Sequence, residues 1–281
     1  MTTKLLKIAL LDMNNGVENE GMRCIKKAIE NFATQEKLPV TYDVYNVRQK
    51  GEVPSLLYDG YISSGGPGNP YPVGEAWERK YFNFLDKVLQ HNADRKQRNK
   101  KHLLLICHSF QLACIHWKVG LVANRRSPSF GVFPVHKTRF GQGESLFEGL
   151  PDPFWVVDSR DFQVIQPNAK VLDRMGAKIL VLEKERPHVD LERAIMAIRF
   201  TKHIIGTQFH PEADAEGMYR HFSKADKKEK ILKTYGVEKY HTMIQHLRDP
   251  NKIALTESII LPQFLQLIKK ASEMMKDPLE I

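Results

Sequence analysis

Two apolar segments, each followed by a reactive polar side chain, constrain the fold of this chain most. Leu103–Cys107 is an aliphatic run that ends in a cysteine, and helix-compatible sequence follows it. His203–Phe209 is a second apolar run, followed by His210 and, two residues further on, Glu212. Short aliphatic runs are typical of strands that are buried on both faces of a parallel sheet. The sequence therefore predicts a thiol, an imidazole and a carboxylate at strand ends, the parts of a cysteine nucleophile with its base and orienting acid.

The segments around Cys107 alternate between strand and helix patterns. Strands are expected at Lys4–Leu11, Val40–Val47, Tyr58–Ser63 and Leu103–Cys107, and helices at Glu18–Phe32, Glu75–Gln90 and Ser109–Lys118. This order predicts an α/β fold with an open, mostly parallel sheet flanked by helices. Ligands bind beyond the carboxyl ends of the strands in such sheets. The glycine-rich segment Ser64–Pro70, Cys107 and His210 all follow predicted strands, so we expect them to form one site.

The pattern changes after Gly131 and again after Glu212. Shorter, often alternating segments predict a small antiparallel extension of the sheet: Val132–Val135, Trp155–Val157, Phe162–Ile165, Ile179–Glu183, Ala194–Phe200 and His203–Gln208. Helices are expected at Ala215–Tyr235, Lys239–Leu247 and Glu257–Met275. We therefore predict a first domain over residues 1–212 and a helical C-terminal extension over residues 213–281 that packs on it.

Composition restricts the partners and the compartment. The net charge of +9 comes from dispersed basic residues, and the one dense run, Arg95–Lys101, is typical of a solvated loop, so a nucleic-acid partner is not expected. The chain has no apolar stretch long enough to cross a membrane, and its N-terminus resembles a strand rather than a signal peptide. Three cysteines do not suit a disulfide framework, which favours a reducing cytoplasm. No nucleotide-binding or metal-binding motif is present, so neither cofactor is expected.

Cys107 lies where a strand gives way to a helix, the position of a nucleophile elbow. A side chain there projects from a sharp turn, and the helix N-terminus favours the thiolate. His210 precedes a proline and should occupy a fixed loop conformation, and Glu212 is close enough in sequence to select its tautomer. Cys24 and Cys114 fit the alternative interpretation of a cysteine, a buried structural residue.

These blocks together resemble the class I (triad) glutamine amidotransferase family, and in particular the glutaminase half of GMP synthase. The matching positions are Ile106, Cys107 and Gln111 in the elbow, Gly206 and Gln208–Glu212 in the GxQFHPE block, Ser64–Asn69 in the SGGPxS-type loop, and Gly131–Thr138 in the GWFPV strand. The resemblance covers roughly residues 5–215 and implies a flavodoxin-like amidotransferase fold.

By this resemblance, Cys107 attacks the side-chain amide of glutamine, forms a γ-glutamyl thioester and releases ammonia. His210 would protonate the leaving ammonia and activate water, while Glu212 orients the imidazole. The resemblance also implies a set of oxyanion and substrate-binding residues: Gly65, Gly66, His108, Gln111, Ser159 and Asp161. Among them, the backbone N–H groups of Gly66 and His108 would hold the oxyanion, and Gln111 would line the glutamine pocket.

The sequence departs from the family in two places. Leu105 and Ser109 stand where the elbow normally has glycines, so we expect a more crowded turn. Asp158–Asp161 (DSRD) replaces a histidine-containing segment that contacts bound glutamine. Ser159 and Asp161 would keep part of that role, and Arg160 would be free to grip a different carboxylate.

Three functions remain open from the sequence. The first is a stand-alone glutamine amidohydrolase, whose ammonia would pass to a separate synthase subunit if it is used. The second is a γ-glutamyl peptide hydrolase with the same triad, which the DSRD segment favours slightly. The third is a catalytically silent binding or regulatory subunit, in which the C-terminal helices contact the partner or a second copy in a homodimer.

Overall fold

One mixed sheet organises the part of the chain that the computed structural model describes, residues 5–188 and 190–273. Its strands are β1 (Leu6–Asp12), β2 (Val40–Asn46), β3 (Gly60–Ser63), β4 (His102–Ile106), β5 (Leu121–Lys137), β6 (Phe154–Ile165), β7 (Lys178–Glu183), β8 (Ile195–Thr201) and β9 (Ile204–Thr207). They lie in the order β2-β1-β3-β4-β9-β8-β7-β5-β6. The pairs from β2 to β9 are parallel, and those from β9 to β6 are antiparallel. The predicted α/β class, with its antiparallel extension, is confirmed.

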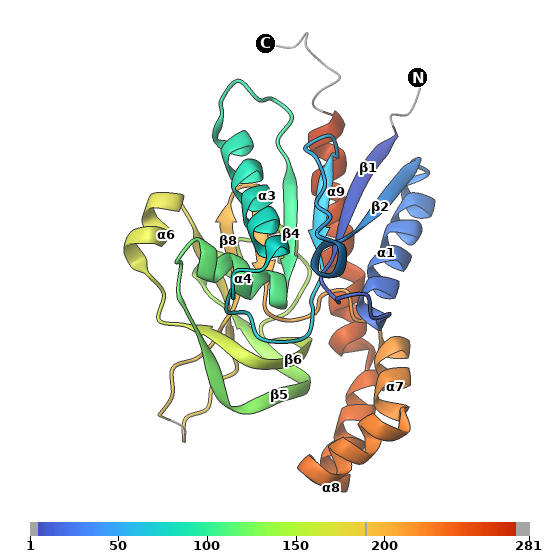
Figure 1. Cartoon of the computed structure of the whole chain (residues 1–281). Helices are drawn as coiled ribbons and strands as arrows, with labels where there is room; N and C mark the ends of the chain where they lie inside the picture. Colours follow the sequence, from blue (N-terminus) through green and yellow to red (C-terminus); the bar gives the residue numbers. More distant parts are fainter. Residues whose placement is uncertain (1–4, 189, 274–281) are drawn as a thin grey trace.

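Helices cover both faces of the parallel strands (Figure 1). The helices are α1 (Glu20–Glu36), α2 (Val47–Lys50), α3 (Ala76–Ala93), α4 (His108–His116), α5 (Arg139–Gln142), α6 (Ala169–Met175), α7 (Ala215–Ser223), α8 (Ala225–Arg248) and α9 (Leu255–Glu273), with short turns η1 (Ser145–Phe147) and η2 (Pro250–Ala254). Successive residues of β1 alternate between two cores: Ile8 and Leu10 pack with α1 and α9, whereas Ala9 and Leu11 pack with α3 and α4. Burial on both faces is the physical reason for the aliphatic runs in the sequence.

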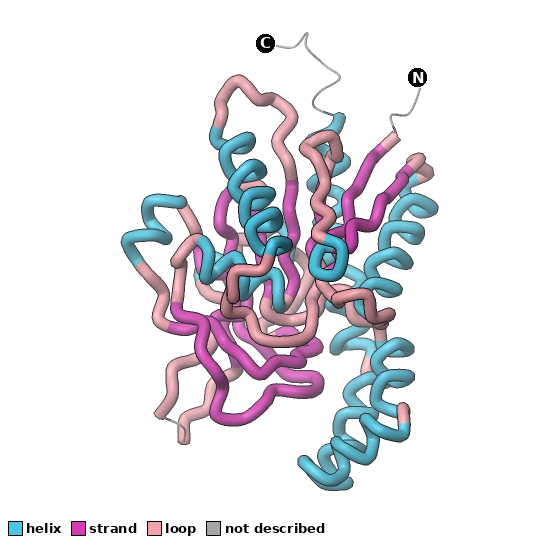
Figure 2. The backbone as a smooth tube through the Cα atoms, in the orientation of Figure 1, coloured by secondary structure: helices cyan, strands magenta, loops and turns pink. Residues whose placement is uncertain are grey.

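The antiparallel strands are longer than predicted. β6 joins the expected segments Trp155–Val157 and Phe162–Ile165 into one strand, and its partner β5 spans seventeen residues. Figures 1 and 2 show this β5–β6 hairpin extending past the carboxyl end of β4. Val157 of β6 forms an isolated bridge with His210, which follows β9. The hairpin therefore forms one wall of the region in which the predicted site residues meet.

The C-terminal helices differ from the prediction in one break. The expected helix Ala215–Tyr235 is two helices, since Lys224 has extended backbone angles (φ −59°, ψ 133°) and separates α7 from α8. Gly236 interrupts α8, as expected, with φ 84°. The predicted element ends at Lys4 and Met275 lie outside the described residues.

The last described helix, α9, belongs to the same core as the first strand. Five of its apolar side chains are buried in the cluster that contains α1: Ile260, Leu261, Phe264, Leu265 and Ile268. A Cβ added at Gly60 in β3 would lie 2.2 Å from Ile268 Cδ1, so a side chain at position 60 would force Ile268 of α9 to move. The domain boundary at residue 212 stays a prediction. None of the helices in the described ranges is long and apolar enough to cross a membrane.

Candidate active site

Cys107 occupies the sharp turn between β4 and α4. Its backbone angles are φ 49° and ψ −100°, a region that residues with a side chain rarely adopt. Its N–H donates a 2.7 Å hydrogen bond to Thr207 O at the end of β9, which fixes the turn against the neighbouring strand. A conformation of this kind costs about 1–3 kcal/mol and is typical of functional sites. The turn has the geometry of a nucleophile elbow.

His210 and Glu212 form a hydrogen-bonded pair next to this elbow. His210 Nδ1 lies 2.8 Å from Glu212 Oε1, and the Glu212 side chain is only 1% exposed. The His210 N–H donates to Val157 O of β6 at 3.0 Å, so the hairpin holds the loop in place. Burial lowers the pKa of His210, but the negative charges of Glu212 and Cys107 and the hydrogen bonds to both raise it well above its usual value. The protonated form of the imidazole is thus favoured, between Glu212 and Cys107.

The glycine-rich loop closes the other side of the site. A Cβ at Gly65 would lie 2.8 Å from His210 Cε1 and 3.5 Å from Cys107 Cβ, so this glycine borders both residues. A Cβ at Gly66 would lie 2.3 Å from Met13 O, closer than real Cβ atoms approach an oxygen. Both positions are therefore restricted to glycine by space. The backbone of the loop approaches the elbow where a side chain would block it.

Ser109 connects the elbow to this loop by a chain of buried hydroxyl groups. Its Oγ donates to Ser64 O at 2.7 Å and lies 2.8 Å from Ser63 Oγ, which in turn lies 2.9 Å from Tyr81 Oη. Because the single hydroxyl hydrogen of Ser109 is used on Ser64 O, Ser63 donates to Ser109 and Tyr81 donates to Ser63. The crowding that we expected at position 109 is not found, since the serine stabilises the loop instead.

Leu105 also fits without crowding the turn. It pairs in register with Gly206 of β9, and a Cβ at Gly206 would lie 3.5 Å from Leu105 Cβ. The side chain of Leu105 is fully buried in the core between the sheet and α3 and α4. The glycine on the neighbouring strand leaves the space that Leu105 and Phe110 need, because a Cβ there would lie 2.6 Å from Phe110 Cδ2.

A pair of buried glutamines reaches the thiol. Gln208 Nε2 donates to Cys107 Sγ at 3.6 Å, and Gln111 Nε2 donates to Gln208 Oε1 at 3.0 Å. Gln111 thus lies near the site as predicted, but it is connected to Cys107 through Gln208. We did not predict a role for Gln208, and its place in the GxQFHPE block was the only signal for one.

The DSRD segment contributes backbone rather than side chains. Ser159 and Asp161 are exposed, and it is the carbonyl oxygen of Ser159 that lies 3.8 Å from Cys107 Sγ. His108 follows Cys107 at the start of α4, where the first N–H groups have no acceptor within the helix. Burial and the nearby Arg48 charge lower the pKa of the His108 side chain to about 4, so the ring is neutral near pH 7.

Arg160 does not reach a substrate carboxylate, in contrast to our expectation. Its guanidinium is 1% exposed and is paired with Asp158 at 2.9 Å and Glu183 at 3.3 Å. Burial of an arginine requires partners of this kind, and here the chain supplies both carboxylates.

The fold and the elbow define the class: an amidotransferase-type α/β protein with a cysteine at the carboxyl edge of its sheet. The model of the family "Glutamine amidotransferase class-I" matches residues 23–226, so the chain belongs to that family. The resemblance predicted from the sequence is confirmed.

Solved structures share the fold at low sequence identity. A glutamine amidotransferase from Thermotoga maritima is 16% identical with a TM-score of 0.65, over 94% of this chain and 97% of that chain. A glutamine amidotransferase from Methylobacillus flagellatus is 15% identical with a TM-score of 0.65, over 95% of each chain. A putative GMP synthase subunit from Thermoplasma acidophilum is 17% identical with a TM-score of 0.57, over 98% of this chain and 100% of that chain. No curated protein matches the sequence.

Proposed function

We propose that the chain hydrolyses the side-chain amide of glutamine through a thioester on Cys107. The observation that supports this most is the meeting of Cys107, the His210–Glu212 pair and Gly65 at one point of the sheet edge. The thiolate attacks the amide carbon, and His210 gives its proton to the departing nitrogen as the C–N bond breaks. Ammonia leaves, and a γ-glutamyl thioester remains on Cys107.

The second half of the reaction uses the same groups in reverse. His210, now neutral, removes a proton from water as the water oxygen attacks the thioester carbon, and the C–S bond then breaks to give glutamate and the thiolate. Glu212 holds the imidazole at Nδ1, so that Nε2 is the nitrogen available for proton transfer. In both steps the oxyanion would be bound by the N–H groups of Gly66 and His108, each worth about 3 kcal/mol in the transition state.

The structure weakens the support for the two alternative functions. The DSRD segment slightly favoured the γ-glutamyl peptide hydrolase, but its Arg160 side chain, which could have bound a different carboxylate, is fully paired inside the protein. The silent subunit was favoured by a degraded elbow, whereas Ser109 and Leu105 both fit it. The likeness to a putative GMP synthase subunit supports transfer of the ammonia to a separate synthase chain. A cytoplasmic location and a homodimer remain predictions.

A glutamine-analogue electrophile tests the proposal. A diazo-ketone analogue of glutamine should add once to the native wild-type chain and to a Cys114→Ala control, and should not add to Cys107→Ala, as read by intact mass. Ammonia release from glutamine should likewise depend on Cys107. If γ-glutamyl peptides are hydrolysed and glutamine is not, the substrate assignment is wrong. If no adduct forms with the wild type, the chain is not a glutaminase.

A further inference from the structure

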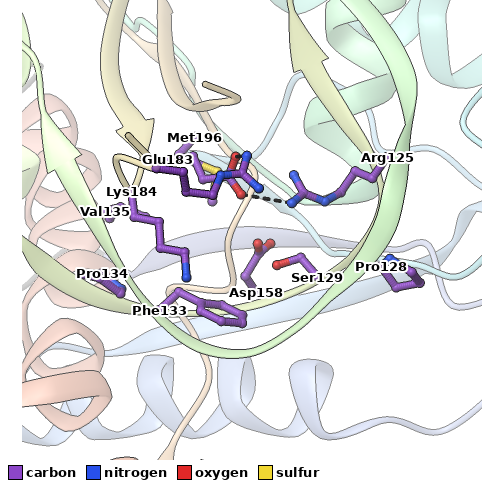
Figure 3. Close-up of a pocket in the computed structure, with 11 residues that line it drawn as sticks. Arg125, Pro128, Ser129, Phe133, Pro134, Val135, Asp158, Glu183, Lys184 and Met196 are labelled. Atoms are coloured by element: carbon purple, nitrogen blue, oxygen red, sulfur yellow. Dashed lines mark hydrogen bonds and ion pairs between the residues drawn. The ribbon is translucent and has the colours of Figure 1, made fainter. Parts of the chain in front are cut away.

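A half-enclosed cavity of about 150 Å³ lies beside the β6 strand. Figure 3 shows it between the β5–β6 hairpin and the end of β7. Among the residues that line it are Arg125, Phe133, Asp158, Glu183, Lys184 and Arg186. Asp158 borders the cavity, whereas the carbonyl of the next residue, Ser159, faces Cys107. The cavity and the proposed active site therefore share one strand.

The two carboxylates in the wall are already neutralised. Glu183 contacts Arg125 at 3.0 Å, Arg160 at 3.3 Å and Arg186 at 2.9 Å. Asp158 accepts from Arg160 Nε through both of its oxygens at 2.9 Å. Three arginines thus face two carboxylates, which leaves the wall positive.

Two lysines from distant parts of the chain add to this excess. Lys184, just after β7, and Lys239, in α8, both place Nζ over the ring of Phe133, at 5.1 Å and 4.6 Å from its centroid. Within the described residues neither lysine forms an ion pair with a carboxylate, and both are half-buried. Burial and the charge of Lys184 lower the pKa of Lys239. Two like charges near one ring without a counter-charge repel each other, and an anion in the cavity that Lys184 lines would reduce that repulsion.

We propose that this cavity is a binding site for a compact dianion, held by Lys184 against the Arg125–Arg186 wall, with the positive charge of Lys239 close by on the ring of Phe133. The volume gives a phosphate group or a small dicarboxylate room to enter. Lysine and arginine donors of this kind recognise phosphate and carboxylate oxygens. The site does not depend on the glutaminase activity, and its test uses binding alone.

Thermal unfolding at fixed ionic strength tests this site with inorganic phosphate and malonate as probes and chloride as the reference. Phosphate or malonate should raise the Tm of the wild type and of the control Lys87→Ala, an exposed lysine on α3. Lys184→Ala/Lys239→Ala should bind the same anion at least tenfold more weakly. The anion with the larger effect identifies the source, a phosphate group or a dicarboxylate. Equal Tm shifts in all three proteins, or none beyond that of chloride, would overturn the proposal.

A measurement on the wild type alone does not depend on how the variants fold. An amine-reactive acylating reagent followed by peptide mapping reports the modification rate of each lysine. The bound anion should slow acylation at Lys184 and Lys239 at least severalfold and leave Lys87 unchanged. Uniform rates with and without the anion would also overturn the proposal.

Discussion

Removal of the Ser109 hydroxyl is the sharpest test of how the elbow is supported. In Ser109→Gly, which restores the residue of the family pattern, Ser64 O loses its donor and the Ser63 hydroxyl loses its acceptor, and both groups are buried. A buried polar group left without its partner costs about 1–3 kcal/mol. After local relaxation we expect a loss of ~2–4 kcal/mol in the free energy of unfolding. Burial raises the pKa of Tyr81 to about 12, so the Tyr81 hydroxyl stays protonated near neutral pH and can donate to Ser63.

The same change should slow the reaction, because Ser64 leads directly into the loop that carries Gly65 and Gly66. Loss of a whole oxyanion donor lowers kcat by roughly 10²–10³. Without the hydrogen bond from Ser109 to Ser64 O the loop is held less firmly, so kcat for ammonia release should fall at least about tenfold.

Three variants separate the hydroxyl from the backbone. Ser109→Ala also lacks the hydroxyl but has a higher helix propensity than glycine, so both variants should lose stability and activity if the hydrogen bonds matter. Ser258→Ala removes an exposed hydroxyl that bonds to Leu255 O, and should stay within about 0.5 kcal/mol of wild type. Urea unfolding and initial rates give both quantities. If Ser109→Gly matches the wild type in both, the hydroxyl chain does not support the elbow.

Three other variants test the charges and spacing around the site. Burial lowers the pKa of His210, but Glu212 and Cys107 outweigh burial and raise it. The protonated imidazole therefore adds stability below about pH 6.5, and this stability is lost as pH rises through the raised pKa. Glu212→Gln should cost more stability at pH 6 than at pH 9 in urea unfolding, and equal costs would contradict this. Burial raises the pKa of Asp214, but hydrogen bonds led by that of Arg23 lower it to about 2, so its contribution is present above about pH 4 and is lost as pH falls. Asp214→Ala also loses the N-cap of α7, and should cost about 1–2 kcal/mol at pH 7 and less at pH 3, whereas a cost independent of pH would argue against the ion pairs. Gly66→Ala places a Cβ 2.3 Å from a backbone oxygen and should lower kcat by roughly 10²–10³, whereas an unchanged rate would remove this loop from the mechanism.

The local patterns of the sequence were sufficient to predict the sheet and the proximity of Cys107 to His210. Leu103–Cys107 and His203–Phe209 are apolar because β4 and β9 are buried on both faces, and they pair in parallel. Cys107 and His210 follow those strands directly, so the carboxyl edge of the sheet brings them together. The proximity of Cys107 to His210 could be predicted because it depends on strand order alone.

The remaining features depend on contacts between distant segments. Ser63 and Tyr81 are far from Ser109 in sequence, and no local pattern indicates that their hydroxyl groups meet. The polar stretch Asn124–Pro128 interrupts the apolar pattern of β5, so the sequence does not predict one continuous strand. In the structure β5 pairs with β6 on both sides of this stretch, with a register shift between Asn124 and Ser129. Lys224 lies in helix-compatible sequence, so no local pattern indicates the break between α7 and α8.

The position of α9 beside α1 has a consequence for the order of events during synthesis. Residues 260–268 complete the core that β1, β3 and β4 begin. A ribosome adds about 5–20 residues each second, so the first strand is exposed to the cell for many seconds before its covering helix emerges. During that interval this face of the sheet lacks the apolar side chains that α9 later buries against it. Cys107, translated well before His210, can gain its imidazole partner only late in the same interval.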